Sequence, residues 1–213
     1  MSKDISRIRN EYKKFSLSKK SINKNPFHQL KDWINQAFEA QVSEPTVMML
    51  ATTGKDGKPS CRVVLLKKIT EQGLHFFTNY ASKKGAQIHE NPYAAITFFW
   101  VELERQVRVE GKIEKLSTEL SDVYFEERPF GSKIAAIISN QSETIESREI
   151  LENEFQILSR KMKAKKVPRP DYWGGYILIP FLFEFWQGRP NRLHDRIAYQ
   201  LRDKYWIINR LAP

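Results

Sequence analysis

Apolar residues recur at two spacings along the chain, one typical of helices and the other typical of strands. Leu30, Trp33, Ile34 and Phe38 follow the helical spacing, and Pro26 precedes them, so we predict a helix within residues 25–41. Residues 105–113 instead alternate strictly between apolar and polar side chains. That alternation predicts a strand with one face buried and one in water, as in an antiparallel sheet.

The remaining segments extend this picture to a sheet protein with additional helices. Asp56-Gly57 is a hairpin signal, and the strands around it predict a β-meander over residues 46–79. Further helices are expected at 82–92, with Ser82 as N-cap, at 117–128, at 132–141 and from about 144. Further strands are expected at 46–54, 60–69, 74–79, 93–103, 173–187, 193–201 and 205–213.

Strands joined in hairpins, rather than alternating with helices, favour an antiparallel barrel with helices packed outside it. The fold class predicted is therefore mainly β with flanking helices. Neither a GxGxxG nor a P-loop pattern is present, so neither phosphate-binding motif is supported. We expect a weakly ordered basic segment at 1–25, with a helix over about 5–15, followed by one domain at 26–213.

Charge and composition narrow the possible partners and location. The net charge is +10, and the first 25 residues hold eight Lys or Arg against two acids. Such charge permits a nucleic-acid partner but suits a phosphorylated small molecule equally well. The single cysteine, Cys61, excludes an intrachain disulfide and a cysteine-based metal site, and Pro180 and Glu184 interrupt the longest apolar run. We expect a soluble cytoplasmic protein without metal.

The densest cluster of candidate chemistry is "GRPNRLHDR" at 188–196, which holds three arginines and a histidine. If this segment is extended, Arg192, His194 and Arg196 share one face. Three potential cations on one face repel each other unless an anion lies among them. A solvated edge strand and a site for an anionic ligand are about equally compatible with this spacing.

Other candidates are individually weak. Arg62 and Lys67 bracket four aliphatic residues; on a regular strand they point to opposite faces, unless Lys67 lies past the strand end, and snorkelling explains both simply. Lys83 and Lys84 lie in the first turn of a helix, where cations oppose the helix dipole. That position suits either a phosphate site or a solvated turn.

Several long blocks, in order, resemble one known family: "RVVLLK", "FFTNYASKKGAQI", "ERQVRVEGKIEKLS", "YFEERPFGSKIAAIISNQS", "VPRPDYWGGY", "EFWQG" and "RLHDR". The chain resembles the pyridoxamine (or pyridoxine) 5′-phosphate oxidases over about residues 25–213. The resemblance implies an FMN-binding split β-barrel and a homodimer with FMN at the interface. It also implies oxidation of pyridoxamine or pyridoxine 5′-phosphate to pyridoxal 5′-phosphate, with O2 as acceptor and H2O2 as product.

The resemblance also implies two sets of site residues. The positions that match FMN contacts are Arg62, Val63, Val64, Leu65, Leu66, Lys67, Phe77, Thr78, Lys83, Lys84, Gln106, Gln141, Ser142, Trp186 and Arg196. The positions that match substrate contacts are Lys67, Tyr124, Arg128, Ser132, Arg192, Leu193 and His194, with Arg9 and Tyr12 in a flap over the substrate. Two departures stand out: Phe77 replaces a tyrosine, and Lys83 replaces a common arginine.

Within this set, Arg192 is expected to orient the reacting carbon, with His194 supporting it. Lys67 and Arg128 would neutralise the substrate phosphate, and the Tyr124 and Ser132 hydroxyls would complete its hydrogen bonding. One alternative is a split-barrel flavin-binding protein or flavin reductase with another substrate. Another is a basic nucleic-acid-binding barrel, which the placement of aromatics in apolar strands disfavours.

Overall fold

The computed structural model describes residues 4–7 and 10–213. The helices are α1 (Pro26–Glu39), α2 (Lys83–Glu90), α3 (Thr118–Glu127), α4 (Phe130–Ile138) and α5 (Arg148–Met162), with short 3-10 turns at Ile5–Arg7, Val101–Leu103 and Pro190–Arg192. The strands are β1 (Val47–Thr53), β2 (Pro59–Leu65), β3 (Lys68–Ile69), β4 (Leu74–Asn79), β5 (Tyr93–Trp100), β6 (Arg105–Lys115), β7 (Trp173–Gln187), β8 (Asp195–Arg202) and β9 (Tyr205–Leu211). No helix in these residues is long and apolar enough to cross a membrane.

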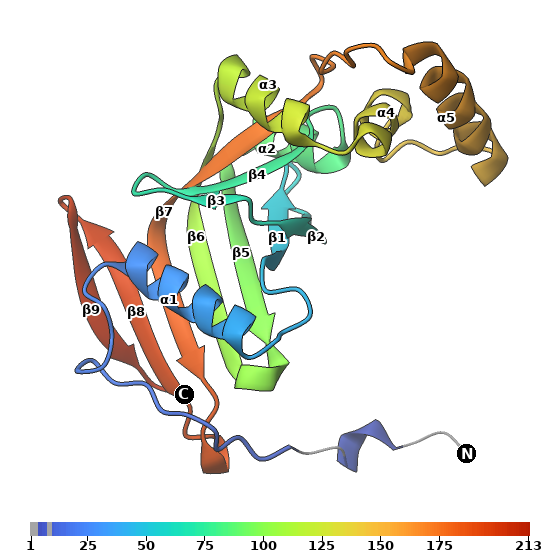
Figure 1. Cartoon of the computed structure of the whole chain (residues 1–213). Coiled ribbons are helices and arrows are strands. Elements are labelled where there is room, and N and C mark those ends of the chain that lie inside the picture. Colours follow the sequence, from blue (N-terminus) through green and yellow to red (C-terminus); the bar gives the residue numbers. More distant parts are fainter. Residues whose placement is uncertain (1–3, 8–9) are drawn as a thin grey trace. The chain divides into compact units, whose positions relative to one another are not determined.

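The strands form one sheet in the order β2-β1-β5-β6-β7-β4-β3, and β8 pairs with β7 and with β9 (Figure 1). The pairs β3–β4, β4–β7, β7–β8 and β8–β9 are antiparallel. The predicted mainly β class with flanking helices is therefore confirmed. The predicted meander holds only in part. Strand β1 pairs with β2 and β3 pairs with β4, as expected, but the strand predicted at 60–69 is broken between β2 and β3, and β4 also pairs with β7.

The chain divides into two compact units, which are described separately. The first unit comprises Met1–Met49, Ile96–Glu110 and Pro180–Pro213, and the second comprises Leu50–Ala95 and Gly111–Ile179. In the first unit, helix α1 begins at the cap residue Asn25, whose side chain accepts from the Phe27 and His28 amides. Of its predicted apolar positions, Leu30, Trp33 and Ile34 are buried, whereas Phe38 is exposed. Trp33 packs on strand β7, with its ring centroid 5.1 Å from that of Phe185. Aromatic packing of this kind forms the core of the unit.

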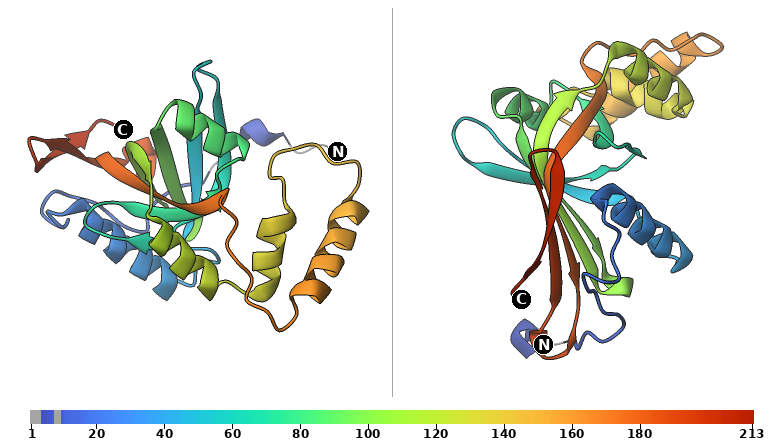
Figure 2. Two further views of the ribbon diagram at one scale, coloured as in Figure 1. Left: turned by 90° about the horizontal axis from the view of Figure 1, so that it is seen from above. Right: turned by 90° about the vertical axis from the view of Figure 1, so that its left-hand side faces the viewer.

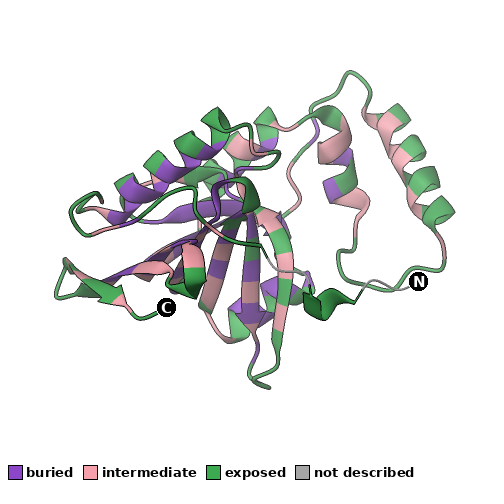
Figure 3. Cartoon of the chain, turned by 90° about the horizontal axis from the view of Figure 1, so that it is seen from below, coloured by how far each residue is buried: buried purple, intermediate pink, exposed green. Residues whose placement is uncertain are grey.

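In the second unit, the predicted cap Ser82 is confirmed, since its hydroxyl accepts from the Gly85 amide at the start of α2. A small core gathers Phe125, Ile134 and Trp173 under helices α3 and α4. Helices α4 and α5 lie side by side (Figure 2). Helix α5 contains no buried residue and appears only pink and green in Figure 3. Its apolar side is only half-buried within this chain, at Leu151, Phe155, Leu158 and Met162.

Two further local predictions are wrong. The helix expected over about 5–15 is limited to the turn Ile5–Arg7, and residues 10–15 are not helical. Residues 190–192 form a 3-10 turn in which Asn191 and Arg192 have positive φ, so strand β8 begins only at Asp195. The shared strand face expected for Arg192, His194 and Arg196 therefore does not form. The turn that connects strands β7 and β8 takes up these residues, so they do not follow the side-chain alternation of a strand.

Candidate active site

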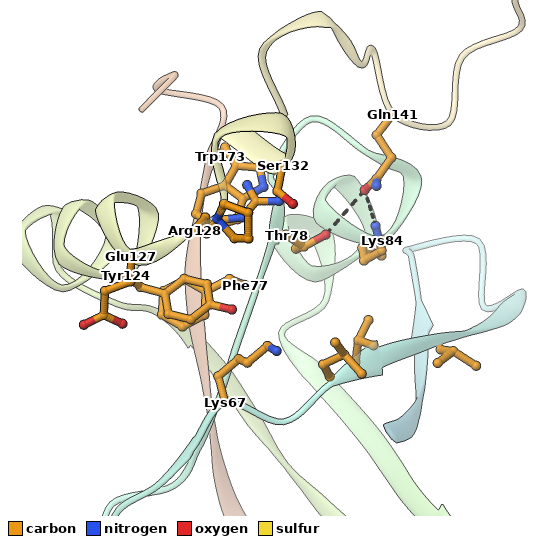
Figure 4. A pocket seen from close by; sticks show the side chains of 14 residues that line it. Lys67, Phe77, Thr78, Lys84, Tyr124, Glu127, Arg128, Ser132, Gln141 and Trp173 are labelled. Atoms are coloured by element: carbon orange, nitrogen blue, oxygen red, sulfur yellow. Dashed lines mark hydrogen bonds between the residues drawn. The ribbon is translucent and has the colours of Figure 1, made fainter. Parts of the chain in front are cut away.

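A cavity of about 550 Å³ opens in the second unit, a size typical of small-molecule sites (Figure 4). It is lined by Val63, Val64, Leu65, Lys67, Phe77, Thr78, Lys84, Tyr124, Glu127, Arg128, Pro129, Ser132, Gln141 and Trp173. All but Glu127, Pro129 and Trp173 are positions that the sequence marked for flavin or substrate. Residues from β2, β4, α2, α3 and α4 thus converge on one space although they lie far apart in sequence.

Positive charge dominates this cavity. Lys67, Lys84 and Arg128 line it, and Glu127 is the only acidic residue in the described lining. Within the described part of the chain, neither Lys84 nor Arg128 has a carboxylate within ion-pair distance. Burial lowers the pKa of the Arg128 guanidinium, and its Nη1 atom is buried without a hydrogen-bond partner. A buried donor of this kind is costly unless an anion satisfies it.

Arg128 is held in place by an aromatic surface. Its guanidinium carbon lies 4.4 Å from the centroid of the Trp173 ring and 5.6 Å from that of Phe125. Arg128 is the C-cap of helix α3, and its extended backbone leads the chain into Pro129. Stacking on Trp173 therefore fixes the guanidinium while leaving the buried Nη1 donor available.

The aromatic rings behind the cavity form a stack. Phe77 and Tyr124 lie with centroids 3.8 Å apart and ring planes 14° apart, and the Trp173 ring is nearly parallel to both. The Phe77 ring thus supports Tyr124 through a face-to-face contact. Figure 4 shows the Tyr124 hydroxyl and the Lys67 ammonium on the same side of the cavity.

Lys84 and Gln141 form a hydrogen-bonded pair at another wall. The Lys84 ammonium donates to Gln141 Oε1 at 2.6 Å and to Ser82 Oγ at 2.9 Å, and Thr78 Oγ1 donates to the same Gln141 oxygen at 3.4 Å. Burial, and then the charge of Arg62, lower the pKa of Lys84 to about 8. Because the Gln141 oxygen accepts from both neighbours, its amide nitrogen remains a donor for a ligand acceptor.

Arg62 does not line the cavity. Its guanidinium donates to the Leu50 carbonyl at 3.1 Å and to hydroxyls of Thr52 and Ser60, and burial lowers its pKa. Strand β2 ends at Leu65, so Lys67 lies past the strand end, one of the two options that the sequence left open.

The other predicted flavin positions of this unit differ in exposure. Lys83 is exposed, and its backbone amide donates to the Ser142 hydroxyl at 3.2 Å. The Leu66 side chain is 5% exposed and belongs to the core, so only its backbone remains for a ligand.

A second group of predicted residues gathers around His194 in the first unit. Tyr12 meets Trp186 and His194 edge-on, with centroid distances of 5.7 and 5.8 Å, and the Trp186 and His194 centroids lie 4.7 Å apart. The Arg189 amide donates to His194 Nδ1 at 3.1 Å. Burial and the charge of Arg192 lower the pKa of His194. Because Nδ1 accepts from a backbone amide, the neutral form of this imidazole carries its proton on Nε2.

Carboxylates of the protein itself neutralise part of the positive charge of residues 188–196. Arg196 Nε donates to Glu184 Oε1 at 2.8 Å, and Arg108 contacts the other Glu184 oxygen at 3.3 Å. Asp195 pairs with Arg210 at 2.6 Å and with Arg189 at 3.5 Å. Arg192 is exposed and makes no ion pair with the described residues. Arg192 is thus the cation of this segment that remains available.

The remaining predicted positions are less informative. Gln106 is half-buried on β6, Leu193 is exposed, and Arg9 lies outside the described residues. Sequence reasoning missed Trp173 as a cavity residue and Glu104 as a contact of the N-terminal segment, since an aromatic or an acid in a strand-rich context gives no specific signal. Residues 4–7 and 10–213 contain no group of three His, Cys, Asp or Glu placed to hold a metal ion.

The chain is similar to known proteins over nearly its whole length. The pyridoxamine 5′-phosphate oxidase family model matches residues 34–159, and the model of the pyridoxine 5′-phosphate oxidase C-terminal dimerisation region matches residues 173–213. A pyridoxine/pyridoxamine 5′-phosphate oxidase of Mannheimia succiniciproducens is 51% identical over 99% of both chains. One from Cyanothece sp. is 48% identical over the whole of both.

Among solved structures, PhzG from Burkholderia lata, in complex with tetrahydrophenazine-1-carboxylic acid, superposes with a TM-score of 0.87 at 30% identity, covering 91% of this chain and 95% of that one. An FMN-binding protein of Nostoc punctiforme, related to pyridoxamine 5′-phosphate oxidase, shares the fold with a TM-score of 0.67 at 16% identity, over 93% and 99% of the chains.

The fold is that of the split β-barrels, as the sequence resemblance implied. Within that class, the chain belongs to the pyridoxine/pyridoxamine 5′-phosphate oxidase family, whose members are FMN-dependent oxidoreductases. It also carries the C-terminal dimerisation region of that family.

Proposed function

We propose that this protein oxidises pyridoxamine 5′-phosphate or pyridoxine 5′-phosphate to pyridoxal 5′-phosphate, with FMN as cofactor, O2 as electron acceptor and H2O2 as product. The main support for this proposal is that about half of the residues are identical, over the full length, to those of pyridoxine/pyridoxamine 5′-phosphate oxidases. The cavity supports it, because its cations and hydroxyls suit a phosphorylated planar ligand. A cytoplasmic location remains a prediction from the sequence.

In this proposal the substrate phosphate binds between Lys67 and Arg128, with hydrogen bonds from the hydroxyls of Tyr124 and Ser132. All four line the same cavity, and the buried Nη1 of Arg128 lacks a partner that a phosphate oxygen would supply. Trp173 fixes the guanidinium, and Phe77 fixes the Tyr124 ring. A phosphate dianion would offset the charge of the two cations.

The residues also fit FMN. Lys84, Thr78 and Gln141 present a cation and polar groups, and none of the three is paired with a carboxylate among the described residues. The lining residues Val63, Val64 and Leu65 offer backbone and aliphatic surface. The positions proposed to hold FMN are Arg62, Val63, Val64, Leu65, Leu66, Lys67, Phe77, Thr78, Lys83, Lys84, Gln106, Gln141, Ser142, Trp186 and Arg196. Bound FMN supplies the hydride-accepting chemistry of the reaction.

The protein's own contribution is orientation and charge. Arg192, with no ion-pair partner among the described residues, is proposed to orient the carbon that bears the amine or alcohol. His194, neutral and protonated on Nε2, would donate a hydrogen bond beside it, while Tyr12 and Trp186 limit water around the imidazole. Leu193 and Arg9 complete the proposed substrate contacts. No protein nucleophile is required.

We also propose a homodimer with FMN at the interface. The matched dimerisation region includes Trp186 and Arg196, two of the proposed flavin positions. Exposed apolar residues on strands, such as Val63 (62% exposed) and Phe99 (47% exposed), are typical of surfaces covered by another subunit.

The experiment that tests the function compares substrates under air. The purified protein, saturated with FMN, is supplied with pyridoxine 5′-phosphate, pyridoxamine 5′-phosphate or a reduced phenazine-1-carboxylic acid, and H2O2 and pyridoxal 5′-phosphate are measured. Turnover of the phosphorylated pyridines supports the proposal. Oxidation of the phenazine alone, as the ligand of the 30%-identical relative would suggest, would replace it.

A further inference from the structure

The N-terminal segment is fastened to the first unit through its backbone. The amides of Lys13 and Lys14 both donate to one oxygen of Glu104, Oε2, at 2.9 and 3.0 Å. A few residues on, the Leu17 amide donates to Asp195 Oδ2 at 2.9 Å. Backbone donors bound by carboxylates are charge-assisted hydrogen bonds, which are about twice as strong as neutral ones.

Glu104 holds this position through unusual local structure. The residue ends the turn Val101–Leu103 in the left-handed region, with φ of 53°, and is 8% exposed. Its own carbonyl accepts from the Gly188 amide at 2.8 Å and from Gln187 Nε2 at 3.1 Å. One residue therefore joins the N-terminal segment to the loop that follows strand β7.

The same junction sets where Tyr12 lies. A Cβ atom added to Gly188 would come within 2.7 Å of Tyr12 Cβ and Cγ and within 3.1 Å of Glu104 Cβ. Glycine at 188 thus lets Tyr12 approach the loop closely. From there the tyrosine ring meets Trp186 and His194 edge-on.

We infer that Glu104 is a positioning residue for substrate binding: its carboxylate anchors the backbone at Lys13–Lys14 so that Tyr12 closes on His194 and Trp186. The inference rests on the proposed function, which places substrate beside His194. Without the anchor, the closed segment becomes a minor state, and apparent affinity falls by the fraction of molecules that remain closed.

The test compares Glu104→Ala with Glu104→Gln in the FMN-saturated protein. Alanine removes the side-chain acceptor. The side-chain oxygen of glutamine can still accept hydrogen bonds from the Lys13 and Lys14 amides. We expect Glu104→Ala to raise KM for pyridoxine 5′-phosphate about tenfold with little change in kcat or flavin content. Glu104→Gln should recover most of the loss. Glu102→Ala, which changes an exposed acid in the same turn, serves as the matched control.

Two further measurements keep the outcome clear. Gly188→Ala should raise KM similarly, because the added methyl displaces Tyr12 while the Glu104 carboxylate is retained. Trypsin should cleave after Lys13 and Lys14 faster in Glu104→Ala than in the parent, whatever the substrate. The inference is wrong if the parent oxidises pyridoxine 5′-phosphate, Glu104→Ala and Gly188→Ala keep the KM of the parent, and trypsin cleaves Glu104→Ala no faster than the parent. If the parent oxidises no phosphorylated pyridine while cleavage still accelerates, the proposed function fails and the anchor stands.

Discussion

The buried guanidinium of Arg128 gives the sharpest prediction for substrate binding. Arg128→Ala removes a cation whose Nη1 is buried and unpartnered and which Trp173 holds 4.4 Å from its ring centroid. A hydrogen bond to a charged group contributes about 1.5–3 kcal/mol. Loss of one or two such bonds to phosphate should therefore lower kcat/KM for pyridoxine 5′-phosphate roughly a hundredfold, mainly through KM.

The assay is H2O2 formation by FMN-saturated protein over a range of substrate concentrations. Arg128→Lys should fall between the parent and the alanine variant, because it keeps the charge but loses the planar fork and the stacking on Trp173. Arg160→Ala removes an equal charge from an exposed position of α5 and controls for net charge. A kcat/KM within twofold of the parent in Arg128→Ala, with FMN still bound, would refute the phosphate assignment.

Three other outcomes are expected. The pKa of Lys84 is lowered from 10.5 to about 8, so between pH 8 and pH 10.5 the unfolded chain binds more protons than the folded one, and the free energy of unfolding of the FMN-free protein should rise with pH. Denaturation of the parent and of Lys84→Met at several pH values checks this. The same pH dependence of unfolding in both proteins would contradict it. Arg192→Ala should impair turnover and leave flavin bound, and Arg192→Lys should recover part of the activity; flavin absorbance and H2O2 formation measure both, and loss of flavin with normal turnover of the remaining holoenzyme would reverse the assignment. Sedimentation at micromolar concentration should give an FMN-loaded dimer, and an FMN-loaded monomer would exclude the interface site.

Local pattern predicted local structure well. Helix α1, the Ser82 cap and the alternating strand β6 follow from side-chain spacing and capping chemistry, which act within a few residues. The pairing of β4 with β7 could not be read in the same way, since it joins residues about a hundred positions apart. Nothing in the spacing of residues 46–79 distinguishes a meander from this crossover.

The same limit explains the site. Lys67, Tyr124 and Arg128 were marked by resemblance, and the fold brings them to one cavity. The extended face expected for residues 192–196 failed because left-handed φ angles at Asn191 and Arg192 close a turn there. The pairing of Arg196 with Glu184 could not be predicted from the sequence either, because it depends on how strands β7 and β8 are paired.

The proposed binding of the substrate phosphate between Lys67 and Arg128 also affects how the product leaves. In the proposed function, oxidation changes the carbon that bears the amine or alcohol and leaves the phosphate ester untouched, so Lys67 and Arg128 would meet the same group before and after turnover. A contact that is equal in substrate, transition state and product lowers KM without accelerating the chemical step. It also holds the aldehyde as firmly as its precursor. Accumulated pyridoxal 5′-phosphate should therefore compete with substrate for the cavity, and slow departure of the product would limit the turnover rate.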